Sequence, residues 1–277
     1  FLEVLAKRND GFNEVETLAA PIHLYDTLYF KEEASGQFAL FIEQLSGDRF
    51  GPPLSTSSDN LIHRALSLLR TRCSVRQGMS VRLVKRIPIQ AGLGGGSSDA
   101  AAALAAGNLL WKLGLSRSEL QELAAELGSD VPLFLEDRPV LCRGRGERIE
   151  PVEPFGPVHF AVVLPPEGLA TPEVFGACRP AKNPTTAQPL IDALQQGDLH
   201  AAGKQLHNQL QPAAESLTPT INRMKSICSG MDSLGHAMSG SGTSYFVLCR
   251  SASHARRVAA RLRACRLGNV LCVCNVT

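Results

Sequence analysis

The sequence predicts an α+β protein, and three patterns support this fold class. Residues 79–87 alternate between apolar and polar side chains, as a half-buried strand does. The Ala-rich run 100–104 follows four glycines and two serines, which is typical of a loop that leads into a helix. Near the C-terminus a helical pattern over 254–265 precedes an apolar strand over 270–276. Strands that flank helices in this order favour α+β sandwiches.

The first half is predicted to contain strands at 24–30, 38–42 and 79–87, and helices at 61–69, from the glycine loop to about 113, and at 117–127. Ser58 or Asp59 is expected to cap the first helix. Gly114 is a helix stop, and Ser116 or Ser118 is expected to begin the next helix.

A proline-rich link at 151–157 separates the two halves, so we expect domains at 1–152 and 153–277. Strands are predicted at 159–164, 235–238, 245–249 and 270–276. Helices are predicted at 191–194, 199–210, 218–230 and 254–265.

Composition excludes several functional classes. The net charge of the 277 residues is only +2, so no nucleic-acid partner is expected, and the arginines between 256 and 266 are interpreted as the solvated face of a helix. No apolar run approaches the ~20 residues of a membrane span, and no secretory signal is visible. The eight cysteines form no CxxC pair, so they are interpreted as buried free thiols of a cytoplasmic protein, with no metal ligands among them.

The glycine loop itself indicates an anion site. Glycines let a ligand approach the backbone closely, and a helix N-terminus presents N–H groups with a partial positive charge, which favours phosphate. The loop lacks the Gly-Lys-Ser/Thr of a Walker A motif, and no acidic residue stands where a Rossmann fingerprint needs one. The alternative is a tight strand-to-helix turn without a ligand.

Four segments in order resemble the GHMP kinase superfamily across nearly the whole chain. They are the Pro88–Ser98 loop, the segment Leu127-Gly128-Ser129-Asp130-Val131-Pro132-Leu133-Phe134, the segment Met238-Ser239-Gly240-Ser241-Gly242-Thr243, and the segment Asp10-Gly11-Phe12-Asn13-Glu14-Val15-Glu16-Thr17. The last resembles the substrate segment of the members that phosphorylate a cytidine diphosphate-linked methylerythritol, although Asn13 stands where they have His. The resemblance implies a two-domain fold, with an N-terminal domain like ribosomal protein S5 and a C-terminal ferredoxin-like α/β sandwich.

The resemblance also implies the site. Asp130 is the catalytic aspartate, expected to be partly buried where a helix bends into an apolar strand, and the alternative is a turn aspartate bonded to its own backbone. Cofactor binding is assigned to Pro88, Ala91, Gly92, Leu93, Gly94, Gly95, Gly96, Ser97, Ser98 and Asn60, with Lys85 also near the ATP base. Substrate binding is assigned to Phe12, Asn13, Thr171, Phe175 and Gly240. Phe12, Thr171 and Phe175 each have a simple packing alternative.

These residues imply an ATP- and Mg²⁺-dependent kinase. It phosphorylates the 2-hydroxyl of the cytidyl compound in the non-mevalonate route to isoprenoid precursors, as a monomer or homodimer. Alternatives are a homoserine or mevalonate type of GHMP kinase, or a nucleotide-binding relative with impaired catalysis. The resemblance further implies a catalytic lysine in a strand just before Phe1, for which Lys7 is not a convincing substitute. We therefore expect the chain as printed to be inactive or severely impaired, and a protein that carries that strand to be active.

Overall fold

The computed structural model describes residues 1–44 and 54–276, and the chain divides into two compact units. Unit 1 comprises residues 1–23, 90–93 and those from Asp137 onward, and unit 2 comprises residues 24–89 and 94–136. The units do not follow the boundary expected at residue 152, because the first strands of the chain belong with the second half. That boundary stays a prediction about the two sequence domains.

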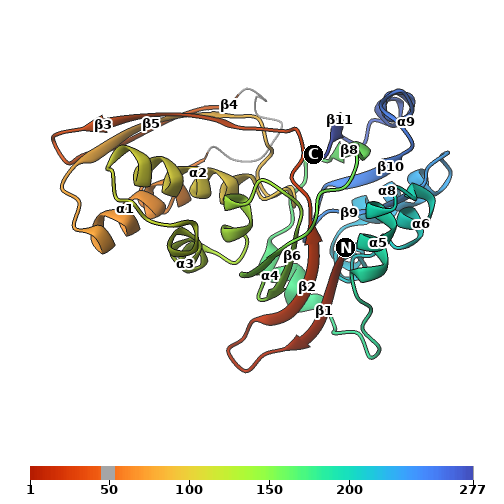
Figure 1. Ribbon diagram of the computed structural model, residues 1–277. Helices are drawn as coiled ribbons and strands as arrows, with labels where there is room; N and C mark the ends of the chain where they lie inside the picture. The colour runs from red at the N-terminus through yellow and green to blue at the C-terminus, as the bar shows by residue number, and fades with distance from the viewer. Residues whose placement is uncertain (45–53, 277) are drawn as a thin grey trace. The chain divides into compact units, whose positions relative to one another are not determined.

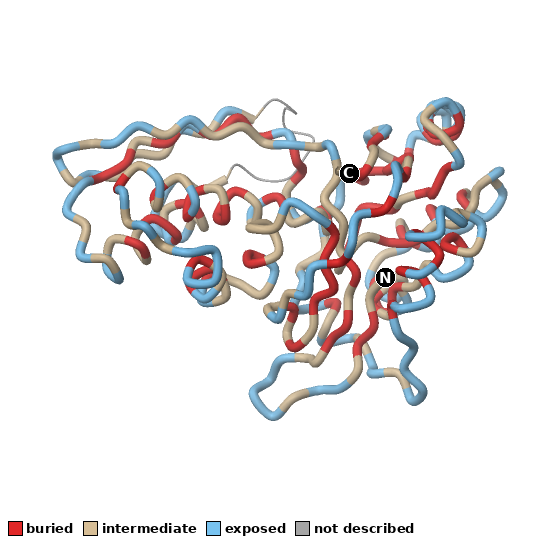
Figure 2. The backbone as a smooth tube through the Cα atoms, viewed as in Figure 1, coloured by how far each residue is buried: buried red, intermediate tan, exposed pale blue. Residues whose placement is uncertain are grey.

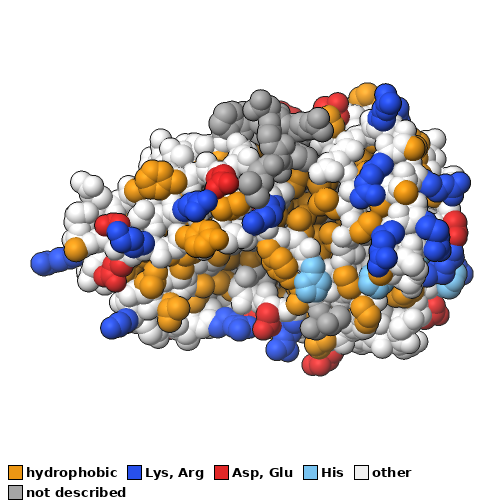
Figure 3. Space-filling view, turned by 90° about the horizontal axis from the view of Figure 1, so that it is seen from above, with side chains coloured by type: hydrophobic (Ala, Val, Ile, Leu, Met, Phe, Trp, Pro, Cys, Tyr) orange, Lys and Arg blue, Asp and Glu red, His pale blue; other side chains and the backbone are white. Residues whose placement is uncertain are grey.

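Unit 2 is a three-stranded sheet with helices on one face (Figure 1). The central strand β5 (Gly78–Lys85) pairs antiparallel with β3 (Thr27–Glu33) and parallel with β4 (Phe38–Gln44). Helices α1 (Leu61–Cys73), α2 (Gly95–Leu110) and α3 (Arg117–Leu127) pack with the short 3₁₀ helix η2 (Pro132–Leu135). Buried residues of β5, α1, α2 and α3 form one hydrophobic core, and Figure 2 marks the buried stretches of the backbone in red. Tyr29 and Phe41 are exposed on the sheet. Figure 3 shows hydrophobic side chains among charged ones on the surface.

Unit 1 contains a four-stranded sheet whose strands come from the start and the middle of the sequence. Strand β1 (Leu2–Lys7) pairs with β2 (Asn13–Ala19), which pairs with β6 (Val140–Gly144), and β7 (Arg148–Pro151) completes the order. The sequence patterns predicted none of these strands, because buried acids such as Glu3 and Glu16 interrupt the apolar alternation.

A second antiparallel sheet in unit 1 has the order β11-β8-β10-β9. Its strands are β8 (His159–Leu164), β9 (Gly235–Met238), β10 (Tyr245–Cys249) and β11 (Asn269–Cys274). The accompanying helices are α4 (Thr171–Ala177), α5 (Gln188–Gln195), α6 (Leu199–Lys204), α7 (Gln211–Leu217), α8 (Pro219–Ser229) and α9 (Ala252–Ala264). Helix α9 buries Val258 and Leu262 and exposes its arginines, which confirms the solvated helix face.

Three local predictions were wrong. Asn60, and not Ser58 or Asp59, caps α1, because its side chain accepts a hydrogen bond from the Ile62 N–H. The helix expected over 199–210 ends at Lys204, since Asn208 uses its side chain to bond other backbone. Cys272 is exposed and not buried, because the strand alternation turns it away from Val273. In contrast, Ser116 begins α3 as expected, with Glu119 completing a capping box.

Among residues 1–44 and 54–276, no helix combines the length and apolar character that crossing a membrane requires.

Candidate functional site

The N-terminus of α2 has the geometry of an anion site. Gly94 caps the helix in the left-handed conformation, with φ 66° and no side-chain cap. Because the first N–H groups of a helix lack an intrahelical acceptor, those of Gly95, Gly96 and Ser97 remain available to a ligand. The Ser98 hydroxyl instead donates to the Gly95 carbonyl at 2.8 Å. The backbone donors at the start of α2 are therefore open to an anion, and the binding role assigned to the loop stays a prediction.

Close packing explains why glycine is needed at Gly94 and Gly95. A Cβ on Gly94 would come within 2.3 Å of the Phe134 ring. A Cβ on Gly95 would meet Ile87 at 2.8 Å and the Lys85 Nζ at 3.0 Å. The glycines thus let η2 and β5 approach the start of α2, in addition to leaving its N–H groups open.

A buried ion triad lies under this helix end. The Lys85 Nζ pairs with Asp99 Oδ2 at 2.8 Å and Asp26 Oδ2 at 2.5 Å, and all three side chains are at most 5% exposed. Desolvation raises the pKa of the Asp99 carboxyl to about 6; Lys85 opposes this rise and Asp26 adds to it. Lys85, expected beside the ATP base, therefore has its ammonium engaged in this triad.

Asn60 has both of its amide groups occupied at the start of α1. Its Oδ1 accepts from the Ile62 N–H at 2.9 Å, and its Nδ2 donates to the Ser55 carbonyl at 2.7 Å. Pro88, also in unit 2, is buried just after β5. The nucleotide-binding roles assigned to both residues stay predictions.

Asp130 lies between the end of α3 and η2. The prediction that the chain here enters a strand was wrong, because the Val131 N–H bonds the Gly128 carbonyl and a 3₁₀ helix follows. Asp130 is exposed, whereas we expected partial burial. Within the described residues its carboxylate makes no hydrogen bond to the protein, so nothing supports the turn alternative.

The surroundings of Asp130 raise the pKa of its carboxyl above the ordinary value through desolvation. Neighbouring atoms crowd the carboxyl, but the side chain still contacts water, and this solvent screens its charge. The arrangement leaves a carboxylate that an incoming hydroxyl can reach.

In unit 1, the segment Met238–Thr243 and the residue after it pack against Ala91 and Gly92 of the glycine loop. The Ser239 hydroxyl donates to the Gly92 carbonyl at 2.8 Å, and the Ser244 N–H donates to the Ala91 carbonyl at 3.0 Å. Gly92 has φ +69°, and a Cβ there would lie 2.2 Å from the Ser239 carbonyl oxygen. Gly240, with φ +54°, likewise approaches Gly92. The two motifs therefore form one hydrogen-bonded backbone cluster.

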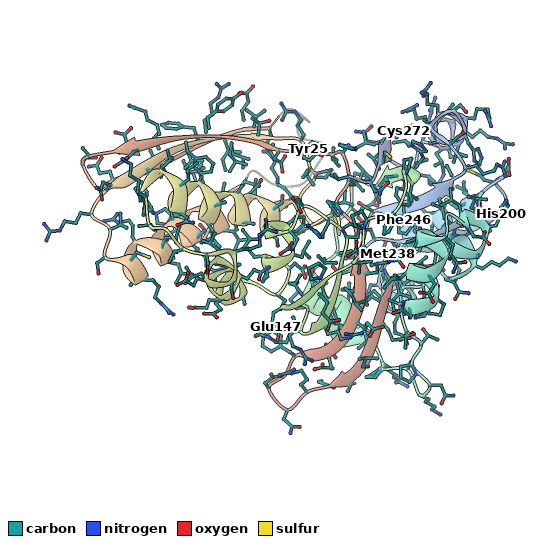
Figure 4. The ribbon with its side chains drawn as sticks, in the orientation of Figure 1. Tyr25, Glu147, His200, Met238, Phe246 and Cys272 are labelled. Carbon is teal, nitrogen blue, oxygen red and sulfur yellow. The ribbon has the colours of Figure 1, made fainter. Side chains whose placement is uncertain are left out.

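Asn208 holds this cluster and was not identified from the sequence. Its buried Nδ2 donates to the carbonyls of Met238 and Gly240, both at 2.8 Å, and its Oδ1 accepts from the Leu210 N–H at 2.9 Å. Met238, labelled in Figure 4, marks where β9 ends and the cluster begins. The one available signal was an Asn inside a helical pattern, where its side chain competes for backbone bonds.

Thr171 and Phe175 come from α4 in the same unit. The Thr171 hydroxyl lies 2.8 Å from the Ser241 hydroxyl, which places Thr171 beside the glycine cluster. Phe175 is partly buried against the core of unit 1, which favours its packing alternative. A substrate contact for each stays a prediction.

Phe12 and Asn13 lie where β1 turns into β2. Phe12 is 47% exposed, so the alternative in which it packs into the core was wrong. Its N–H donates to Asp10 Oδ1 at 3.1 Å, and the Arg145 guanidinium lies over its ring at 4.7 Å. Asn13 is the first residue of β2 and pairs with Lys7. An accessible aromatic ring beside an amide suits recognition of a nucleobase.

Comparisons with known proteins identify the family. The GHMP kinase N-terminal domain model matches residues 60–137, and the GHMP kinase C-terminal model matches residues 190–266. The 4-diphosphocytidyl-2-C-methyl-D-erythritol kinase of Pelotomaculum thermopropionicum is 42% identical over 264 residues, covering 95% of this chain and 90% of that protein. The enzyme of the same name from Shouchella clausii is 36% identical, covering 95% and 86%.

Solved structures agree with this assignment and confirm the two-domain α+β fold. A crystal structure of 4-(cytidine 5'-diphospho)-2C-methyl-D-erythritol kinase matches with TM-score 0.80 and 34% identity, covering 99% of this chain and 95% of that one. Homoserine kinase from Cytophaga hutchinsonii matches with TM-score 0.74 at 19% identity, covering 94% and 89%, which shows a shared fold alone. The chain therefore belongs to the GHMP kinases, in the family of the 4-diphosphocytidyl-2-C-methyl-D-erythritol kinases.

Proposed function

We propose that this protein transfers the γ-phosphoryl group of ATP to the 2-hydroxyl of 4-diphosphocytidyl-2-C-methyl-D-erythritol. The observation that carries the proposal is the open N-terminus of α2, capped by Gly94 without a side chain, in a chain 42% identical to a kinase of that name. The product would be a 2-phosphate for isoprenoid precursor synthesis. We expect the protein to act in the cytoplasm as a monomer or homodimer.

The ATP phosphates would bind at the start of α2. The N–H groups of Gly95, Gly96 and Ser97 and the helix dipole would stabilise negative charge that moves during transfer. The Ser239 hydroxyl bonds the Gly92 carbonyl and would thereby fix the loop backbone that leads to Gly94. The remaining donor-site assignments, Pro88, Ala91, Leu93, Ser98 and Asn60, belong to the same proposal.

Asp130 would orient the acceptor hydroxyl or accept its proton. Phosphoryl transfer depends mainly on positioning and electrostatic stabilisation, so a carboxylate able to accept one hydrogen bond from the hydroxyl is sufficient for this role. The exposed Asp130 carboxylate has no competing hydrogen bond among the described residues. Its geometry therefore supports the assignment.

The cytidyl compound would be recognised by residues of unit 1. Phe12 offers a ring face for stacking the base, and Asn13 offers an amide donor and acceptor for its polar edge. Thr171, Phe175 and Gly240 are proposed as further substrate contacts, and Thr171 and Gly240 lie in one hydrogen-bonded cluster with Asn208 and Ser241.

Mg²⁺ is expected to accompany ATP and to neutralise charge on the phosphates. Protein sites for ATP-bound Mg²⁺ use one or two carboxylates with the phosphates and waters, so they need no cage of protein ligands. Among the described residues no group of three or more His, Cys, Asp or Glu side chains is placed to hold a metal ion, which is compatible with such binding.

A substrate panel tests the proposal. Purified full-length protein is mixed with Mg·ATP and, separately, the cytidyl compound, homoserine and mevalonate, and ADP release is followed. Of the three acceptors, we expect only the cytidyl compound to cause ADP release. NMR should then place the new phosphate on its 2-hydroxyl. Turnover with homoserine or mevalonate instead would refute the substrate assignment, and no turnover with any of them would favour an impaired relative.

A further inference from the structure

Phe12 has a fixed backbone but an exposed ring. Its N–H donates to Asp10 Oδ1 at 3.1 Å, and its carbonyl accepts from the Arg8 N–H at 2.8 Å. Arg8 also pairs with Asp10 at 3.0 Å, so the turn is closed on itself. The ring is nevertheless 47% exposed. An aromatic ring gains stability when it leaves water, so this arrangement is typical of a surface that binds a ligand.

Arg145 covers this ring from a neighbouring turn. Strand β2 pairs with β6 so that Val15 faces Gly144, which brings the β6–β7 turn next to the start of β2. Gly144 has φ +73°, and the Arg145 N–H donates to Glu147 Oε2 at 2.6 Å, which defines the turn that Glu147 marks in Figure 4. The Arg145 guanidinium carbon lies 4.7 Å from the centre of the Phe12 ring.

The other arginines around this turn have different partners. Arg8 and Arg148 both pair with Glu14, at 2.8 and 2.7 Å. The Arg145 Nε lies 4.0 Å from Glu147 Oε2, which is the outer limit of an ion pair. The Arg145 charge also reaches Asp10, where it adds to the effect of Arg8 in lowering the pKa of the carboxyl. Because no carboxylate forms a close ion pair with Arg145 among the described residues, the contact with the Phe12 ring places the guanidinium, and the same contact places the ring.

We propose that Arg145 is a positioning residue that holds the Phe12 ring for stacking of a pyrimidine base on its opposite face. The inference rests on the proposed function, because it assumes that the acceptor carries such a base. A ring has two faces, and with one face covered by the guanidinium the base stacks on the other. A cation over an aromatic face at an exposed site contributes about 0.5–1 kcal/mol, which corresponds to roughly a two- to fivefold change in affinity.

The test measures cytidine 5'-monophosphate binding by calorimetry in four proteins. Arg145→Met keeps an unbranched side chain but removes the guanidinium and its charge, and should weaken binding about two- to fivefold. Arg145→Lys retains a cation and should recover most of that loss. The matched control, Arg148→Met, breaks the pair with Glu14 in the same turn and should bind as the wild type does. Equal affinity of Arg145→Met and wild type would overturn the inference, as would tighter binding, which would mean that the guanidinium occupies the face the base needs.

A second ligand separates stacking from attraction of the phosphate. Ribose 5-phosphate has the phosphate without the base, so its weaker binding should be unaffected by Arg145→Met. An equal loss for both ligands would show that Arg145 acts by charge alone and would overturn the positioning role. In turnover, the KM for the cytidyl compound should rise two- to fivefold while kcat and the KM for ATP stay unchanged. If the full-length wild type binds the nucleotide through Arg145 yet shows no cytidyl-dependent turnover, the proposed function fails and this inference stands.

Discussion

Gly94→Ala should destabilise unit 2 at the anion-binding end of α2. Gly94 has φ 66°, and an L residue in the left-handed region costs about 1–2 kcal/mol. The added Cβ would also lie 2.3 Å from the Phe134 ring, so the ring must move, and overpacking of this kind costs about 1–3 kcal/mol. Together these effects predict a loss of about 2–5 kcal/mol in the free energy of unfolding.

Gly96→Ala is the matched control in the same segment. Gly96 is already helical, and a Cβ there would make an ordinary contact with Leu61 at 3.6 Å. Replacing a helical glycine by alanine should therefore stabilise the protein by up to about 1 kcal/mol. Urea unfolding followed by circular dichroism compares the two variants with the wild type.

A double-mutant cycle with Phe134→Leu separates the two costs. Leucine has fewer atoms near the added Cβ, so the double variant should be less destabilised than the sum of the single variants, by about 1–3 kcal/mol. The left-handed strain should remain in the double variant. The reasoning would be refuted if Gly94→Ala were as stable as Gly96→Ala, or if the two substitutions were additive.

Three further predictions concern Asp130, Asn208 and Asp99. Asp130→Asn should lower kcat about 10²- to 10⁴-fold without changing the circular dichroism spectrum, and unchanged turnover would exclude Asp130 from the chemistry. Asn208→Ala leaves two buried carbonyls without their donor and should cost about 2–4 kcal/mol in urea unfolding, whereas Asn222→Ala on an exposed helix face should cost less than 1; equal losses would contradict the role of Asn208. Because the folded state raises the pKa of Asp99 to about 6, its proton is held more tightly when folded, and its contribution to stability is present below pH 4 and lost between pH 4 and 6. The stability of wild type relative to Asp99→Asn should therefore fall across that range, and a rise would contradict the burial of this charge.

Local patterns predicted the elements whose cause lies in adjacent residues. Alternation located β5, and Ser116, one of two serines expected to begin the helix, marks the start of α3, because capping and strand periodicity depend on neighbours in the chain. The four motifs in order predicted the family, which the relatives confirm. The substrate-binding and catalytic roles of individual residues stay predictions, since each role depends on how residues from several segments contact a ligand.

Other features depend on residues far apart in the chain. Strands β1 and β2 belong with β6 because pairing satisfies their backbone groups, although their buried acids hide the apolar pattern. Asn208 leaves a helical pattern because two carbonyls beyond residue 237 need its amide. The exposed Phe12 ring contacts Arg145, which comes from another turn far along the chain.

Neighbouring residues alone fix the glycine loop, the order of the motifs and the capped start of α3. Contacts between distant segments place the Phe134 ring against Gly94, bring Lys85 into a buried triad and bring the Ser239 hydroxyl to the Gly92 carbonyl. The physical reason is the range of the interactions. Torsional preference and capping act over a few residues, whereas packing and burial depend on which distant segments the fold brings into contact.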